Sequence, residues 1–201
     1  SLAGQRHIGV DAPLAGRLLA EQARGEGDVI PLRHNLMRVA EAEFCFRMGA
    51  DLPPRAVPYT QEEVLAAVAA LHLAIEVPDT RFTDFASVGA PSLIADNACT
   101  GHFVLGPEVT ADWRAADLAL HVVNADVGGR YRRDGIGANV LGDPRIALAW
   151  IANELSALGI PLAAGQVVTT GTCVTPLEII PGDVVTADFG AFGHVTARFG
   201  D

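Results

Sequence analysis

Hydrophobic and polar positions along the chain predict many strands and two well-marked helices. Residues 39–48, VAEAEFCFRM, alternate with a period of two, so Glu41 and Glu43 share one face of a strand with Cys45 and Arg47. A hairpin is expected over 117–135, where LALHVVN alternates and glycines follow at the turn. Further strands are expected at 29–32, at 102–106, in a short segment ending within 75–82, and in the tail at 166–172, 184–190 and 194–199.

Two helices carry recognisable start signals. Thr60 is a good N-cap with Glu63 three residues later, and apolar residues at helical spacing predict a helix that gives way to a strand around Leu73. Asp143 and Pro144 begin the second helix, which Gly159 ends. The segments up to Asp28, over 50–58 and over 87–101 are expected to be loops. Many strands with two solid helices predict a mixed, largely β domain with helices packed against it.

Composition narrows the class of protein. The chain has 201 residues, half of them hydrophobic, which suits one domain spanning 1–201. A net charge of -10 argues against nucleic-acid or anionic-membrane partners, since phosphate binding needs a basic surface. No apolar run reaches the roughly 20 residues that span a bilayer. Three widely spaced cysteines do not suggest a disulfide framework, so a soluble protein in a reduced, cytoplasmic setting is expected.

The two glutamates on one strand face pose a chemical question. Adjacent carboxylates repel each other and raise each other's proton affinity unless water screens them or a cation lies between them. Glu76, at the end of another apolar run, could complete a three-carboxylate site for a hard divalent cation such as magnesium or manganese. A solvated strand face, or pairing with an arginine such as Arg47 or Arg81, is an alternative explanation.

Five segments, in order along the chain, carry a family resemblance. They are VAEAEFCFRMGADLP, HLAIEVPDTRFTDF, LIADNACTGHFVLG, NVLGDPRIALAWIANEL and AGQVVTTGTCVTPLEIIPGDVVTADFG. Together they resemble the 2-keto-4-pentenoate hydratase branch of the fumarylacetoacetate hydrolase superfamily. The most specific pieces are the Glu-x-Glu strand, E-V-x-D-[ST]-R, A-D-N-A, and the T-G and P-G-D motifs of the tail.

This resemblance implies a fold, a cofactor and a substrate class. The fold would be α+β, a mixed β-roll or sandwich of the fumarylacetoacetate hydrolase C-terminal-domain type with a few packed helices. Glu41, Glu43 and Glu76 would bind Mg2+ or Mn2+, and the cation would stabilise the enolate of a small 2-oxo acid. The expected activity is hydration of a 2-oxo-4-enoate to a 4-hydroxy-2-oxo acid, by an enzyme that self-associates as its relatives do.

The resemblance also implies roles for other residues, and each of these residues has an alternative structural explanation. Asp79 is a candidate catalytic residue, and with Arg81 it would organise the site by hydrogen bonds to the metal ligands, although a structural ion pair explains both. Asn97 resembles a substrate-binding wall residue, or it braces a loop. Thr170 and Gly171 match a turn whose hydroxyl and N–H could bind the substrate carboxylate, or which simply joins two strands.

Two departures from the family pattern keep other activities open. The family lysine would lie upstream of Ser1, so a missing N-terminal segment is expected, and Leu14 stands where hydratases commonly carry an acid/base aspartate. Leucine cannot move a proton. The TGT motif at 170–172 resembles the form found in the hydrolases of the superfamily slightly more than the form typical of the hydratases. An acylpyruvate-type C–C hydrolase, a 2-oxo-acid decarboxylase and a non-catalytic homologue are therefore the alternatives.

Overall fold

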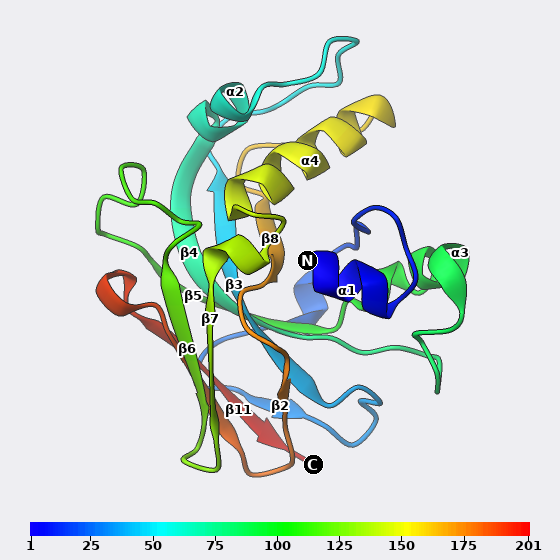
Figure 1. The fold of residues 1–201 in the computed structure, drawn as a ribbon, viewed down its shortest axis with the longest axis vertical. Helices are drawn as coiled ribbons and strands as arrows, with labels where there is room; N and C mark the ends of the chain where they lie inside the picture. Colours follow the sequence, from blue (N-terminus) through cyan, green and yellow to red (C-terminus); the bar gives the residue numbers. More distant parts are fainter.

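The computed structural model of the chain describes residues 1–201, apart from the side chain of Leu2. Two sheets form the body of the fold (Figure 1). The first has the order β1-β5-β4-β3-β8, with β9 paired to β3, and the second has the order β2-β11-β10-β6-β7. β1 pairs with β5 and β2 with β11 in parallel, whereas the other pairings are antiparallel. These mixed sheets with few helices are the expected α+β architecture.

The elements have the following bounds. The strands are β1 Ala23–Arg24, β2 Val29–Pro31, β3 Val39–Met48, β4 Val68–Val77, β5 His102–Glu108, β6 Val122–Val127, β7 Arg132–Ile136, β8 Val167–Thr172, β9 Leu177–Glu178, β10 Val184–Asp188 and β11 His194–Gly200. The helices are α1 Leu2–His7, α2 Gln61–Ala66, α3 Gly89–Ala95 and α4 Pro144–Ala157, with short 3-10 turns at Ala20–Gln22, Asn97–Cys99, Gly137–Asn139 and Gly190–Phe192.

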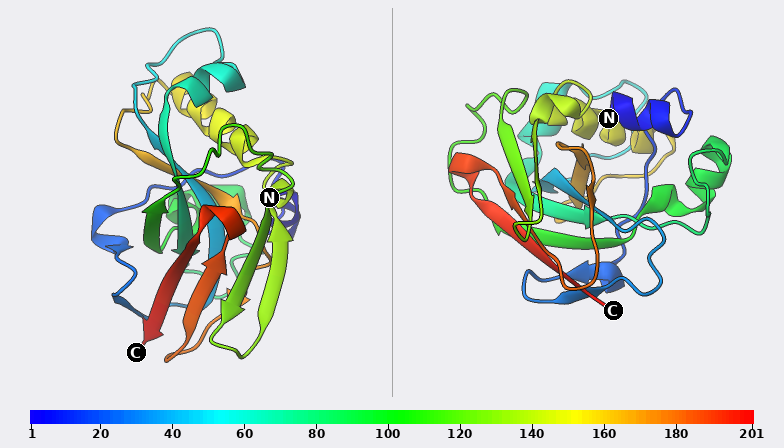
Figure 2. Two further views of the ribbon diagram at one scale, coloured as in Figure 1. Left: turned by 90° about the vertical axis from the view of Figure 1, so that its left-hand side faces the viewer. Right: turned by 60° about the horizontal axis from the view of Figure 1, so that its bottom comes forward.

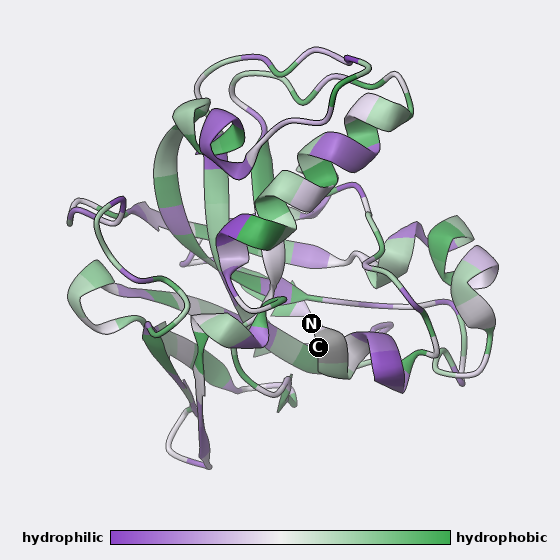
Figure 3. Ribbon diagram, turned by 45° about the horizontal axis from the view of Figure 1, so that its top comes forward, coloured by the Kyte–Doolittle hydropathy of each residue, from purple (hydrophilic) through white to green (hydrophobic). Residues whose placement is uncertain are grey.

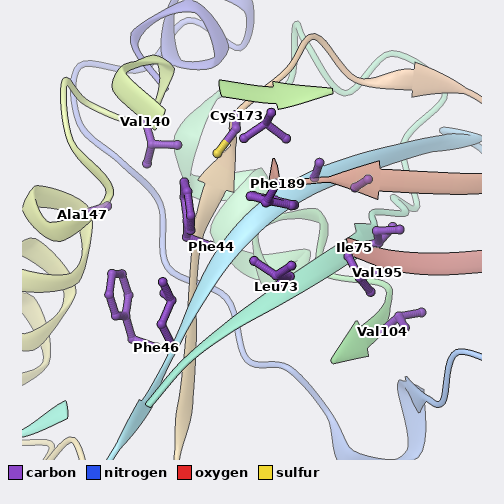
Figure 4. Close-up of a cluster of buried hydrophobic side chains, with 14 of the residues drawn as sticks. Phe44, Phe46, Leu73, Ile75, Val104, Val140, Ala147, Cys173, Phe189 and Val195 are labelled. Atoms are coloured by element: carbon purple, nitrogen blue, oxygen red, sulfur yellow. The ribbon is translucent and has the colours of Figure 1, made fainter. Parts of the chain in front are cut away.

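The main hydrophobic core lies where the two sheets and α4 meet. Phe44 and Phe46 project from β3 on the face opposite the glutamates, and both are fully buried. Figure 4 shows Phe44 near Phe189 and Val140, and Phe46 on the side of α4. The Phe44 and Phe189 rings meet edge to face, with centroids 5.1 Å apart. The alternation of β3 therefore separates an apolar core face from a face that carries the acids.

α4 covers the upper part of the first sheet, beside β8 and α2 (Figures 1 and 2). Asp143 caps it by accepting a hydrogen bond from the Arg145 N–H at 2.7 Å, and Gly159 follows its end with φ +74°. Figure 3, in which the ribbon is coloured by hydropathy, shows both apolar and polar residues along α4, as expected of a helix with one buried face. The predicted helix is confirmed at both ends.

The expected helix after Thr60 is much shorter than predicted. The capping box is present, with the Thr60 side chain and Glu63 each bonded to the other's backbone N–H, but α2 ends at Ala66 and β4 begins at Val68. β4 lies between β3 and β5 and is buried on both faces, so its sequence is continuously apolar and does not alternate. A short apolar run of this kind fits a helix and a buried strand equally well.

Two segments predicted as loops contain helices. The segment before Asp28 begins with α1, and the 87–101 segment contains α3 and a 3-10 turn. The hairpin is confirmed as β6 and β7, with Gly128 and Gly129 at positive φ in its turn, although β6 starts later than expected, at Val122. Among the described residues, no helix is both long enough and apolar enough to cross a membrane.

Candidate metal centre

Pairing between β3 and β4 brings three glutamates together. Glu41 lies directly opposite Glu76 in the antiparallel register, and Glu43 follows two residues along β3 on the same face. One carboxylate oxygen from each residue lies within 4.8 Å of the other two. Glu43 is only 1% exposed, and Glu41 and Glu76 are half-buried. The strand pairing thus builds an acidic cluster from residues 35 positions apart in the chain.

A bulge in β8 fixes the orientation of Glu43. Glu43 pairs with Thr172 and Cys45 with Thr169, so two steps along β3 correspond to three along β8. Gly171 lies inside this bulge with φ +103°, a conformation that glycine adopts without strain. Its N–H donates to Glu43 Oε2 at 2.7 Å, while Glu43 Oε1 is buried and has no hydrogen-bond partner among the described residues. One oxygen of Glu43 is held in place and the other is buried without a partner.

The electrostatics of the cluster are unfavourable without a cation. Burial raises the pKa of Glu41, Glu43 and Glu76 from 4.5 to about 8 each. Repulsion between the carboxylates raises the pKa of each further. Smaller effects oppose this rise: the Gly171 N–H at Glu43, the terminal amino group at Glu41 and Glu43, and a hydrogen bond with Glu43 at Glu76. Three clustered, buried or half-buried acids with raised proton affinity are typical of a site that exchanges protons for a metal ion.

Neither simpler explanation for the paired glutamates fits the geometry. A solvated strand face is wrong for Glu43, because almost none of its surface is exposed. Arg47 pairs with Glu108, with Nη2 and Oε2 3.0 Å apart, and Arg81 pairs with Asp96. The two arginines considered as partners therefore do not neutralise the cluster.

The donor set fits a hard divalent cation. All three side chains offer carboxylate oxygens, which are the ligands that Mg2+ and Mn2+ prefer. The unpartnered Glu43 Oε1 is the kind of buried acceptor that a cation would satisfy. Three protein carboxylates also leave coordination positions for water or for a chelating substrate. The cluster can therefore hold such an ion.

The glutamates lie in a large cavity. Its volume is about 1490 Å3, and its lining includes the α1 segment, the 12–18 loop, β8 and one face of α4. Leu14 and Ala15 line it, as do Phe85 and Leu93. Trp150 contributes an aromatic surface from α4. A mostly apolar chamber with a few convergent polar groups is the usual form of a small-molecule site.

Asp79 and Arg81 do not make the hydrogen bonds that the resemblance suggested. Asp79 Oδ1 accepts from the Leu36 N–H at 2.8 Å and from the Thr80 N–H at 2.9 Å. Arg81 bonds to Asp96, whose pKa is lowered by its hydrogen bonds with Thr80 and Arg81 despite an opposing burial effect. Their described hydrogen bonds thus brace the turn after β4, and none reaches a glutamate. A catalytic role for Asp79 stays a prediction.

The three predicted substrate-binding residues also have partners inside the protein. The Asn97 side chain bonds to both the N–H and the carbonyl of Arg17, which is the loop-bracing alternative. The Thr170 hydroxyl donates to the Phe44 carbonyl at 3.1 Å, and the Gly171 N–H is taken by Glu43. Thr170 and Gly171 line the cavity, but their polar groups orient the glutamate strand in this structure.

Some features of the site have only weak signals in the sequence. The β8 bulge is signalled by Gly171 within an otherwise strand-like run, where a glycine often marks a bulge. The left-handed turn Asn97–Cys99, with φ from +54° to +62°, has no such signal beyond Asn97 itself. Cys45 and Cys173 are buried, burial raises the pKa of both thiols, and Cys173 belongs to the main hydrophobic core. Cys99 lines the cavity, and burial raises its pKa too.

Curated relatives of this chain include several named hydratases. The 2-keto-4-pentenoate hydratase of Paraburkholderia xenovorans (strain LB400) is 33% identical over 199 residues, covering 99% of this chain and 72% of that protein. The 2-hydroxyhexa-2,4-dienoate hydratase of Comamonas testosteroni is 36% identical over 160 residues, covering 80% of this chain and 59% of that protein.

A solved structure and a family model agree with this relationship. The 4-oxalocrotonate decarboxylase from Pseudomonas putida G7, complexed with magnesium and adipate, is 30% identical with a TM-score of 0.87, covering 99% of this chain and 74% of that one. The model of the fumarylacetoacetate (FAA) hydrolase C-terminal domain matches residues 16–200, so the predicted fold class is confirmed. The chain belongs to the fumarylacetoacetate hydrolase family.

Proposed function

We propose that this protein is a divalent-metal-dependent lyase that hydrates a 2-oxo-4-enoate of the 2-hydroxypenta-2,4-dienoate type to a 4-hydroxy-2-oxo acid. The observation that carries the proposal is the Glu41, Glu43 and Glu76 cluster, with one buried oxygen lacking a partner, on the wall of a large cavity. The hydratase relatives and a magnesium-bound decarboxylase of the same fold support it.

In this proposal, the glutamates hold Mg2+ or Mn2+, and the Gly171 N–H keeps Glu43 oriented toward the ion. A bound divalent cation supplies positive charge that stabilises the enolate of a 2-oxo acid. The substrate carboxylate and 2-keto oxygen would face the glutamate cluster. The apolar walls formed by Leu14, Phe85 and Leu93 would shield the hydrocarbon part of the substrate from bulk water.

Decarboxylation of a 2-oxo acid is the second candidate. Leu14 lines the cavity and cannot transfer a proton, which removes one expected acid/base group of a hydratase from this site. Loss of carbon dioxide generates the same enolate without removal of a proton. The likeness to the 4-oxalocrotonate decarboxylase, at a TM-score of 0.87, also favours this candidate over a C–C hydrolase.

Product analysis distinguishes these activities. The protein, loaded with Mg2+ or Mn2+, is incubated with 2-hydroxypenta-2,4-dienoate, with 4-oxalocrotonate and with an acylpyruvate, and the products are identified by mass spectrometry. Hydration adds one water to the first substrate, decarboxylation releases carbon dioxide from the second, and hydrolysis releases an acid from the third. We expect the first outcome, lost when a chelator is added. Absence of turnover with all three would favour a non-catalytic homologue.

Two further expectations belong to the same proposal. We expect a cytoplasmic enzyme that self-associates and takes no nucleic-acid or membrane partner, in a bacterial breakdown route for aromatic compounds. The acidic net charge of -10 supports the absence of a nucleic-acid partner. Light scattering after size-exclusion chromatography measures the subunit count, and a single-chain mass at micromolar concentration would contradict the expected self-association.

A further inference from the structure

Arg17 is an unusual residue of the cavity lining. Of the described lining residues, it is the only one with an arginine or lysine side chain, whereas Glu41, Glu43, Glu76 and Glu178 all contribute acids. Its guanidinium makes no hydrogen bond or ion pair in the described structure. Two other lining residues can carry a positive charge, His7 and Ser1 with its terminal amino group. The His7 ring packs edge to face on Phe85, and the Ser1 amino group acts on Glu41 and Glu43, whose pKa values it lowers. A free cation in an acidic cavity is a candidate for anion recognition.

The backbone of Arg17 is held firmly although its side chain is free. Asn97 Oδ1 accepts from the Arg17 N–H at 2.7 Å, and Asn97 Nδ2 donates to the Arg17 carbonyl at 2.9 Å. The preceding Gly16 lies so close to the same turn that an added Cβ would sit 2.3 Å from the Asn97 carbonyl oxygen and 2.2 Å from Thr100 Oγ1. Only glycine allows this approach, so the 16–17 segment is fixed against the 97–100 turn.

The positions of the charges suggest what Arg17 recognises. The glutamates lie at the buried end of the cavity, since Glu43 is almost inaccessible, and Arg17 lies at an exposed position of the lining. A 2-oxo acid whose first two carbons face the glutamate cluster would extend its remaining chain away from that buried end. A second carboxylate on that chain would add negative charge to a cavity that is already acidic, and Arg17 offers it a partner.

We propose that Arg17, positioned by Asn97, is a specificity-determining residue that selects 2-oxo acids with a second, distal carboxylate over those with an apolar tail. This inference rests on the proposed function, because the first carboxylate and the keto oxygen must be anchored at the metal centre. Within that function, it predicts that a 2-oxo-4-enoate with a distal carboxylate is preferred to 2-hydroxypenta-2,4-dienoate. The planar guanidinium can form two parallel hydrogen bonds with a carboxylate, which an ammonium group cannot reproduce.

A matched pair of ligands tests the proposal without requiring turnover. 2-Oxoadipate and 2-oxohexanoate have the same six-carbon chain and the same 2-oxo acid end, and they differ only in the distal carboxylate. Their dissociation constants for the full chain are measured by calorimetry with saturating Mn2+. The expected preference for 2-oxoadipate is between about threefold and tenfold, since the contact is partly exposed and charge-assisted.

Variants separate recognition from positioning. Arg17→Gln should abolish the preference and leave 2-oxohexanoate binding unchanged, and Arg17→Lys should retain only part of it. Asn97→Ala should reduce the preference although Asn97 does not line the cavity, because its side chain holds the Arg17 backbone. Arg33→Gln is the matched control, because Arg33 is an exposed arginine outside the cavity lining. Thermal melts of each variant verify that it is folded.

The outcomes are distinguishable. Equal binding of the two acids to the unmodified protein, or a preference that survives Arg17→Gln, would overturn the role of Arg17 while leaving the metal-centred function intact. Failure of both acids to bind in the presence of Mn2+ would overturn the proposed function and the inference together.

Discussion

At the residue scale, the sequence alone predicts which acids share a face but not what surrounds them. Period-two alternation places Glu41 and Glu43 together, and this is what β3 shows. That Glu76 lies opposite Glu41 depends on strand register, which the sequence does not specify on its own. The partners of Asp79, Arg81 and Asn97 were not predictable either, because each side chain bonds to a turn or loop that is placed by the tertiary fold.

The raised proton affinity of the glutamates has a measurable consequence for stability. The pKa of each is about 8 in the folded protein, against an ordinary value of 4.5. Between these values the folded protein holds protons that the unfolded chain has released, so the free energy of unfolding falls as the pH rises. Each pKa unit corresponds to about 1.4 kcal/mol for one group.

We therefore expect the metal-free protein to lose at least about 1.4 kcal/mol of stability between pH 5 and pH 8. Urea unfolding in the presence of a chelator, at constant ionic strength, measures this change. Glu76→Gln removes one of the interacting acids and should flatten the pH dependence. A free energy of unfolding that stays constant or rises over this pH range would contradict the electrostatic description of the cluster.

At the element scale, a helix or strand is predicted correctly where its local sequence signals agree with its tertiary context. α4 has a capping aspartate, a proline in its first turn and a terminal glycine, and all three features are present in the structure. α2 has an equally good cap, but the apolar residues that follow it, which the sequence predicts to be helical, belong to β4. A strand that is buried between two neighbouring strands has no alternating pattern to identify it. The start of the helix was therefore predicted correctly, but its length was wrong because the apolar spacing of β4 was interpreted as helical.

The bulge in β8 gives a prediction about backbone conformation. Gly171→Ala forces a residue with a Cβ into φ +103°, which should cost about 1–2 kcal/mol of stability. It should also turn the N–H away from Glu43 and weaken Mn2+ binding. Gly182→Ala is the control, because Gly182 has a similar φ of +92° and no heavy atom within 4 Å of an added Cβ.

Urea unfolding and Mn2+ calorimetry on both glycine variants test this prediction. We expect comparable losses of stability but a loss of metal affinity only for Gly171→Ala. Equal Mn2+ affinity in the two variants would show that the Gly171 N–H does not orient the carboxylate for the ion.

At the scale of the whole molecule, the fold explains why distant segments build one site. The alternation of β3 places its core side chains on one face and Glu41 and Glu43 on the other, and pairing with β4 brings Glu76 to the same face as the two glutamates. β8 adds the N–H that orients Glu43, and the loop around Arg17 adds the cation. The resemblance predicted the fold class and the three glutamates. It did not predict the cavity or the loop contacts, because these depend on how distant segments pack together.

Metal binding by the glutamate cluster is the central claim, and calorimetric titration with Mn2+ at pH 8 tests it most directly. The comparison is between the unmodified protein, the Glu41→Gln/Glu43→Gln double variant and the control Glu154→Gln, in which an exposed acid of α4 is changed. We expect one Mn2+ site per chain in the first and third proteins and no binding in the double variant, which should remain folded by circular dichroism. Undiminished Mn2+ affinity in the folded double variant would contradict the account.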